Sequence, residues 1–144
     1  IQKIIEKHSD IPNNLEIISH GDPMTIIQTS TVICGFRTTA LLEAMAAGKP
    51  LIIPHFAEAK SAAMAAFILD LGEAAEYADS EDDLVEKACK HLQKRDKPII
   101  ELTPSNISVL EKWTGNSDGN AGTRVANAVM TEINGSGGSS SGER

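Results

Sequence analysis

The chain is poor in aromatic residues and has no dense block of basic residues. Phe, Trp and Tyr together make up 3% of the 144 residues, and the formal net charge is −7. Single-stranded nucleic acid needs aromatic side chains on which its bases stack, and duplexes need clusters of Lys and Arg for their phosphates. We therefore expect no nucleic-acid partner.

Cysteines and long apolar runs are also scarce. Cys34 and Cys89 lie far apart and lack the spacing of a metal site, so we expect two reduced core residues and no bound metal. No run approaches the roughly 20 apolar residues of a membrane span, and the first residues do not have the pattern of a signal peptide. These features predict a cytoplasmic protein without a transmembrane segment.

What is present is ordinary globular composition, with 41% hydrophobic and 23% charged residues. It predicts one folded domain over residues 1–133. The run 135–144 is rich in Gly and Ser and too poor in apolar residues to fold, so we expect a tail or cloning remnant over residues 134–144. Because the chain opens without Met inside a helical pattern (Ile1, Ile4, Ile5), we expect it to be part of a longer protein.

Short apolar runs alternate with helical patterns along the chain. The predicted strands are 15–19, 31–34, 51–54 and 73–78, and the predicted helices are 22–28, 38–47, 57–71, 80–92 and 123–133. Strands separated by helices favour parallel pairing with right-handed crossovers, hence an α/β, Rossmann-like doubly wound sheet. Ligands of such sheets bind beyond the carboxyl ends of the strands. The loops that matter are therefore 19–23, 35–39, 54–60 and 78–80.

The loop Gly35–Thr39 (GFRTT) joins a predicted strand to a predicted helix. Gly35 permits close backbone approach, Thr38 and Thr39 offer hydroxyls, and the free N–H groups of a helix start attract anions. A diphosphate would suit this loop. The alternative is that Thr38 only caps the helix and Gly35 only turns the chain.

Glu43 follows in the same predicted helix, four residues after Thr39 and so on the same face. A carboxylate at that place can accept hydrogen bonds from two ribose hydroxyls. The alternative is an ordinary solvated glutamate on an exposed face.

The run Phe36–Pro54 (FRTTALLEAMAAGKPLIIP) is similar to the Glu-Ala-Met-Ala-x-Gly-x-Pro-Val-Ile segment of GT-B glycosyltransferases. Its Gly-Phe-x-Thr-Thr-x-Leu-Leu-Glu form looks most like transferases that build bacterial capsules and other surface polysaccharides. A looser likeness covers Gly115–Arg124, and the whole resemblance spans residues 10–133. It implies that the chain is the carboxyl-terminal half of a GT-B enzyme.

The resemblance implies a nucleoside diphosphate sugar as substrate, with no further cofactor. Glu43 would bind the ribose, and the helix start would hold the diphosphate. An amino-terminal domain outside this chain would bind the glycan acceptor, either in the cytoplasm or at the inner face of the membrane. The fragment alone would be inactive.

Further residues enter through the same resemblance. His55, Glu58 and Lys60 would face the sugar and phosphates, and Arg37 or Lys60 would offset the charge of the leaving diphosphate. His20 and Gly21 occupy the loop that usually holds the base. For each side chain the alternative is a surface residue.

One departure concerns the reaction. Many retaining GT-B enzymes carry a second glutamate at the position that Gly35 occupies here. The stereochemical course and the catalytic residues therefore stay open.

Two other functions fit the pattern less well. Sugar-nucleotide 2-epimerases and polyol-phosphate transferases use a similar sheet, but the epimerases tend to have a Ser-Gly-Gly turn where this chain has Gly35–Arg37. A non-catalytic flavodoxin-like phosphoacceptor module would need acidic residues clustered at the strand ends. The three clearest predicted strands end instead at Ser19, Cys34 and Pro54.

Overall fold

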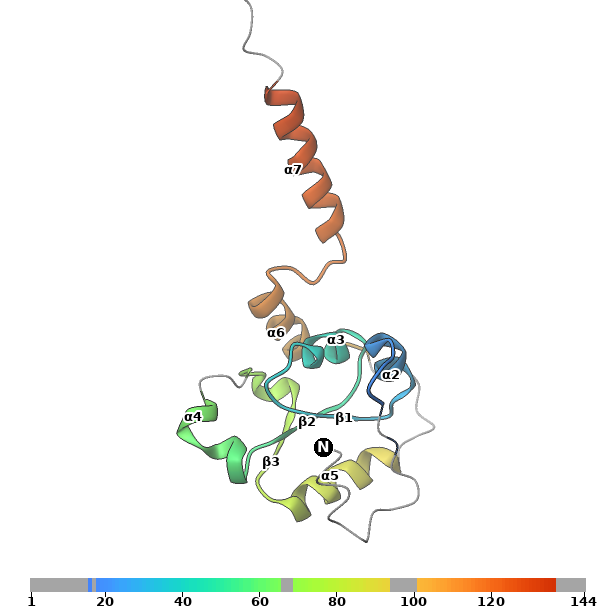
Figure 1. Ribbon diagram of the computed structural model, residues 1–144, viewed down its shortest axis with the longest axis vertical. Coiled ribbons are helices and arrows are strands. Elements are labelled where there is room, and N and C mark those ends of the chain that lie inside the picture. The colour runs from blue at the N-terminus through green and yellow to red at the C-terminus, as the bar shows by residue number, and fades with distance from the viewer. Residues whose placement is uncertain (1–15, 17, 66–68, 94–100, 137–144) are drawn as a thin grey trace, which may run out of the picture.

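The computed structural model of the chain describes residues 16, 18–65, 69–93 and 101–136, and it is a mixed α/β structure (Figure 1). The elements are α2 (Pro23–Thr29), β1 (Ile33–Cys34), α3 (Ala40–Ala46), β2 (Leu51–Pro54), the 3₁₀ turn η1 (Ala57–Lys60), α4 (Ala62–Ala65), the 3₁₀ turn η2 (Gly72–Ala74), β3 (Glu76–Ala78), α5 (Glu81–Leu92), α6 (Pro104–Thr114) and α7 (Ala121–Ser136). The predicted helical start and the end of the predicted tail lie outside the described residues.

The three strands form a parallel sheet in the order β1-β2-β3. Ile52 pairs with Cys34 on one side and with Glu76 on the other. The parallel arrangement expected from the alternation of strands and helices is therefore confirmed. The sheet has three strands among the described residues, where four were predicted.

Pro54 explains why β1 is short. Even-numbered residues of β2 bond to the β1 side, as shown by the N–H of Gly35, which donates to the carbonyl of Ile52 at 3.2 Å. The next bond of this ladder would need an N–H at position 54, which proline lacks. Odd-numbered residues face β3, so the N–H of His55 still donates to Ala78 O at 2.7 Å.

The core lies around β2, whose Leu51, Ile52 and Ile53 are all buried. Figure 1 shows α3 on one side of the strands and α5 on the other. Helix α3 contributes the buried Leu41 and Met45. A strand covered on both faces reads as continuously apolar, which is why the unbroken run Leu51–Ile53 predicted it correctly.

Local capping signals placed several helices correctly. The side chain of Asp22 accepts hydrogen bonds from the N–H groups of Met24 and Thr25 at the start of α2. Ser80 Oγ accepts from Asp83 N–H at the start of α5. Gly48 has φ +68° and ends α3, as expected for a glycine at a helix C-terminus.

Two predicted elements are wrong. The strand over residues 15–19 does not form at residues 16, 18 and 19, which are the described ones. Since β1 has only two residues, it offers little ladder for a further strand. The long helix over residues 57–71 is broken at Ser61, whose extended backbone (φ −67°, ψ 146°) separates η1 from α4.

Two further predictions need correction. Helix α6, bounded by Pro104 and Thr114, was not predicted. Cys34 and Cys89 are free thiols, but both are exposed, so neither is a core residue. In addition, α7 extends to Ser136 and so includes the first residues of the predicted tail.

Candidate functional site

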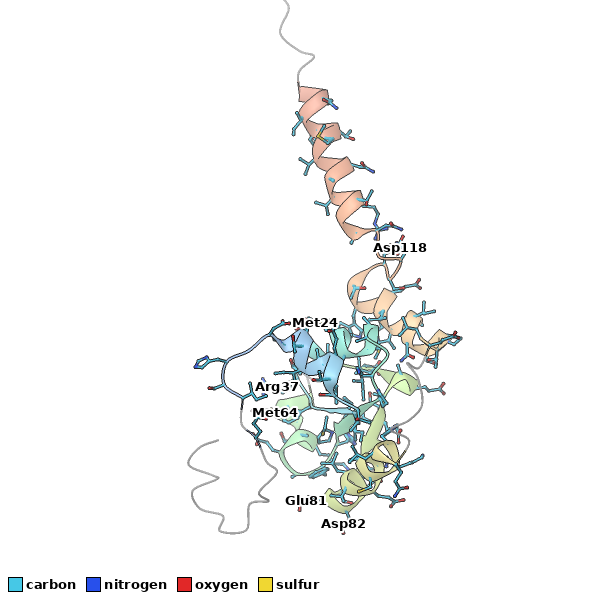
Figure 2. The ribbon with its side chains drawn as sticks, turned by 90° about the vertical axis from the view of Figure 1, so that its right-hand side faces the viewer. Met24, Arg37, Met64, Glu81, Asp82 and Asp118 are labelled. Carbon is cyan, nitrogen blue, oxygen red and sulfur yellow. The ribbon has the colours of Figure 1, made fainter. Side chains whose placement is uncertain are left out.

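Three loops leave the sheet at the same edge. They follow the carboxyl ends of β1, β2 and β3 and comprise residues 35–39, 55–61 and 79–80, which together we call the carboxyl edge. The first loop contacts helix α4, which follows the second loop, because Arg37 Nη1 lies 2.9 Å from the sulfur of Met64; Figure 2 shows these two residues side by side. The second and third meet where His55 Nδ1 lies 3.4 Å from Asp79 Oδ1. The sheet thus brings together three of the four loops expected from the sequence.

The loop after β1 has polar groups without partners in the described part of the protein. Helix α3 begins at Ala40, two residues later than predicted, which leaves Thr38 and Thr39 exposed in the loop. Thr38 Oγ1 accepts from Ala40 N–H at 3.2 Å, whereas Thr39 makes no side-chain cap. Among the described residues, the backbone N–H groups of Phe36, Thr38 and Thr39 donate to no protein acceptor.

Gly35 is not required by the packing of the protein. A Cβ atom built at this position would meet Leu41 Cδ2 at 3.7 Å and Thr38 Cγ2 at 3.9 Å, which is ordinary contact. Gly35 also has no left-handed φ. Any need for glycine here comes from something other than the described protein atoms.

Glu43 lies in the first turn of α3 and is exposed. Its N–H donates to Thr39 O at 3.4 Å, so the two residues are one helical turn apart. Within the described ranges, its carboxylate makes no hydrogen bond or ion pair. The predicted pair of Thr39 and Glu43 therefore shares one side of the helix, next to the open N–H groups.

Backbone strain marks the two adjacent loops. Among the residues that the structure describes, Arg37 (φ +57°) and Ala57 (φ +47°) are the non-glycine residues with positive φ. A left-handed backbone costs L-residues about 1–2 kcal/mol, and such strain concentrates at functional sites. One strained residue lies in the loop after β1 and the other in the loop after β2.

The loop after β2 carries the predicted residues His55, Glu58 and Lys60. His55 Nδ1 lies 3.4 Å from Asp79 Oδ1, and the ring packs edge-on against Tyr77 with centroids 6.2 Å apart. Glu58 and Lys60 are exposed on η1, and neither makes an ion pair with another described residue.

Asp79 is a site residue that the sequence analysis missed. It directly follows β3 and so lies at the carboxyl edge beside His55. The sequence did carry a signal, because an acidic residue stands between the predicted strand and the capping Ser80. The acidic residues after it belong to the first turn of α5 and are not at the end of a strand.

His20 and Gly21 lie apart from this cluster. Both are exposed before α2, and His20 makes no hydrogen bond or ion pair with any other described residue. The neighbouring Asp22 is engaged in capping, and its hydrogen bonds with Thr25 and Met24 hold the pKa of its carboxyl below the usual value. No hydrogen bond, ion pair or ring contact joins His20 to the three loops of the carboxyl edge among the residues that the structure describes.

A cavity of about 240 Å³ lies at the opposite, amino end of the strands. Its lining includes Met45, Leu51, Glu76 and Asn106. Two of its polar side chains already have partners, since Glu76 binds His91 at 2.6 Å and Asn106 exchanges hydrogen bonds with the helix cap at Thr103. We therefore place the candidate site at the open carboxyl edge and not in this cavity.

The carboxyl edge offers hydrogen-bonding groups and charge. Cys34, the last residue of β1, has a thiol whose pKa is raised because neighbouring protein atoms desolvate it in spite of its exposure, which makes it a poor nucleophile. In the described part of the chain, no three His, Cys, Asp or Glu side chains gather as a metal site, and no helix there is long and apolar enough to cross a membrane.

Comparisons with protein-family models, curated proteins and solved structures found no match for the chain.

Proposed function

We propose that this chain is the donor-binding domain of a GT-B glycosyltransferase and that it binds a nucleoside diphosphate sugar at the carboxyl edge. The observation that carries the proposal is the pairing of Thr39 with Glu43. Both are exposed, they lie one turn apart on α3, and they adjoin the open N–H groups of the Gly35–Thr39 loop. The resemblance of Phe36–Pro54 to GT-B enzymes supports the same assignment.

The bound nucleotide would extend along α3 and its preceding loop. The N–H groups and the hydroxyls of Thr38 and Thr39 donate to the diphosphate, and the cations of Arg37 and Lys60 balance its charge. The ribose hydroxyls donate to the carboxylate of Glu43. When the sugar is transferred, the same donors stabilise the charge that develops on the leaving diphosphate.

The rest of the enzyme belongs to the proposal as well. The carboxyl edge is an exposed surface, while the cavity lies at the other end of the strands. This suits a ligand held between two domains, with the sheet forming part of a doubly wound domain. The second, amino-terminal domain would bind a growing surface glycan, either in the cytoplasm or at the inner face of the membrane.

Thermal unfolding with added nucleotides tests the proposal directly. A ligand that binds only the folded state raises its stability by RT ln(1 + [L]/Kd), about 2.7 kcal/mol at one hundred times Kd. We expect one of UDP, GDP, CDP and ADP to raise the unfolding temperature more than the others. If none of the four raises it at millimolar concentration, the donor-binding proposal is wrong.

Glu43→Gln tests the ribose contact. Hydrogen bonds to a charged group contribute about 1.5–3 kcal/mol, so we expect nucleotide affinity to fall roughly 10- to 100-fold. Glu111→Gln is the matched control, because Glu111 is an exposed helical glutamate on α6, away from the carboxyl edge. Equal affinity of the Glu43→Gln variant and the wild type would contradict the ribose assignment.

A further inference from the structure

Helix α5 has apolar side chains on the face that points away from the sheet. Its inner face contacts β2 and β3 and includes the half-buried Leu84 and Ala88. On the other face Val85 is 59% exposed, Leu92 is 51% exposed, and the free thiol of Cys89 is exposed. Spacings of four and three residues place these three side chains on one line along the helix. We call Val85, Cys89 and Leu92 the outer stripe.

Hydrogen bonds near both ends of α5 fix the direction in which the outer stripe points. Near the first turn, the backbone N–H of Asp79 donates to Asp83 Oδ2 at 2.9 Å. Near the last turn, His91 Nε2 lies 2.6 Å from Oε1 of Glu76, the first residue of β3. A rotation of the helix that buried the outer stripe would break both contacts. The stripe is therefore a fixed feature of the surface.

The charges on α5 change sign along the helix. Its first turn holds acidic residues and its last turn holds basic ones. Beside the outer stripe, Glu86 and Lys90 are exposed one turn apart, and neither makes a hydrogen bond or ion pair with another described residue. A sequence of charges that runs from negative to positive is complementary to the same helix in the opposite direction. The two helix dipoles also attract each other in that arrangement.

We propose that two copies of the chain associate through α5, with the helices antiparallel about a two-fold axis near the middle of the outer stripe. Val85 of each copy then lies opposite Leu92 of the other, and Glu86 lies opposite Lys90. The midpoints of these two pairs agree within about one residue, a rise of about 1.5 Å. Symmetry repeats each contact, so the dimer has two ion pairs beside the stripe. The two copies of Cys89 meet near the axis.

The surroundings of the stripe favour a second copy over a lipid surface. Helices that lie on membranes are rich in basic residues beside their apolar face. Here the exposed neighbours of the stripe include three acidic residues, Glu81, Asp82 and Glu86, and one basic residue, Lys90. Figure 1 also shows α5 on the side of the strands opposite α3. Association through α5 therefore leaves α3 open and does not depend on the proposed nucleotide binding.

Sedimentation of the whole chain over a range of concentrations tests the association. A single pair of short helices is a small interface, so we expect a dissociation constant on the order of 10–100 μM. The double variant Val85→Ser/Leu92→Ser should stay monomeric at millimolar concentration. The matched control is Val125→Ser/Val129→Ser, which removes two equally exposed apolar side chains from α7. It should associate like the wild type.

Charge reversal tests the antiparallel direction. Glu86→Lys or Lys90→Glu alone replaces both ion pairs of the dimer with like-charge contacts, which should weaken association about tenfold or more. A mixture of the two variants restores opposite charges at both contacts, so heterodimers should form with nearly the affinity of the wild type. Glu111→Lys on α6 changes the net charge equally and should have no effect.

Cross-linking locates the axis. A short bismaleimide joins two nearby thiols, so it should give a covalent dimer of the wild type and of Cys34→Ser but not of Cys89→Ser. A wild type that is monomeric at millimolar concentration would overturn the proposal, and so would loss of association in the α7 control. The same holds if the mixed charge variants associate no better than each alone, or if the chain binds anionic vesicles through the outer stripe without self-association. Circular dichroism of each variant checks that it is folded.

Discussion

Gly35 has room for a side chain that it does not carry. The nearest atoms to a Cβ at this position lie at 3.7 and 3.9 Å, and its φ is not left-handed. A residue that could be alanine on grounds of packing but lies beside open N–H groups fits a backbone on which a ligand lies closely. The absent side chain is then explained by the proposed ligand.

The Gly35→Ala variant distinguishes the effect of this position on the packing of the protein from its effect on ligand binding. Because the backbone conformation and the space both accept a methyl group, we expect the free energy of unfolding to stay the same or to rise by about 0.4–1 kcal/mol. Nucleotide affinity should fall, since the methyl group would stand where the diphosphate approaches. Denaturant unfolding and titration of the same protein provide both values, and an alanine variant that binds nucleotide normally would contradict the close approach.

Single residues were predicted best where one local rule decides their role. Asp22, Ser80 and Gly48 follow capping rules and lie where the sequence placed them. The pair of His55 and Asp79 could not be predicted, because its partners are 24 residues apart and meet only through the register of β2 and β3.

At the scale of elements, α6 shows a signal that was overlooked. Thr103 and Asn106 form a reciprocal capping box, with Pro104 at the first helical position. Thr-Pro-Ser-Asn therefore marked a helix start even though the preceding residues gave no pattern. Leu110 of this helix is buried in the core, and α6 contacts α3 there.

Thr103→Ala tests how much the cap of α6 contributes. Loss of an N-cap hydroxyl costs about 1 kcal/mol, so we expect the free energy of unfolding to fall by that amount in denaturant titration. Thr103→Ser keeps the hydroxyl and should retain most of the stability. Equal loss in the two variants would mean that the methyl group of Thr103, and not its hydroxyl, stabilises the helix.

The segment 57–71 shows that helix propensity alone does not predict the structure of a segment. Alanine is the best helix former, yet the chain has a left-handed residue at Ala57 and an extended one at Ser61. Ala59 between them is buried, so the short turn η1 directs this side chain inward. Helix propensity alone therefore does not decide the structure of this segment.

At the scale of the whole molecule, α7 stands away from the rest, as both figures show. Every side chain of residues 121–135 is exposed, including Val125, Val129 and Ile133, which form one apolar stripe at helical spacing. The described body of the chain, residues 18–65, 69–93 and 101–114, has its own core without them.

Truncation after Asn120 tests the independence of the body. Since α7 buries nothing against the described residues and its pair of Arg124 with Asp118 is exposed, we expect the unfolding free energy to change by less than about 0.5 kcal/mol. In the full chain, amide hydrogen exchange of α7 should be fast, because an isolated helix of this length is only marginally stable in water. Slow exchange there, or a clear loss of stability on truncation, would show that α7 packs against the body.

The proline at the end of β2 has a wider consequence. Successive residues of β2 form backbone hydrogen bonds alternately with β1 and with β3. The position of Pro54 in this alternation therefore decides which of the two following loops loses a hydrogen bond to β2 and which keeps one. Inserting or deleting one residue in β2 would turn Pro54 toward β3, where its missing N–H would remove the bond that anchors His55, and the loop after β1 would instead continue along the sheet. A one-residue shift in β2 would thus disrupt both loops of the proposed donor site.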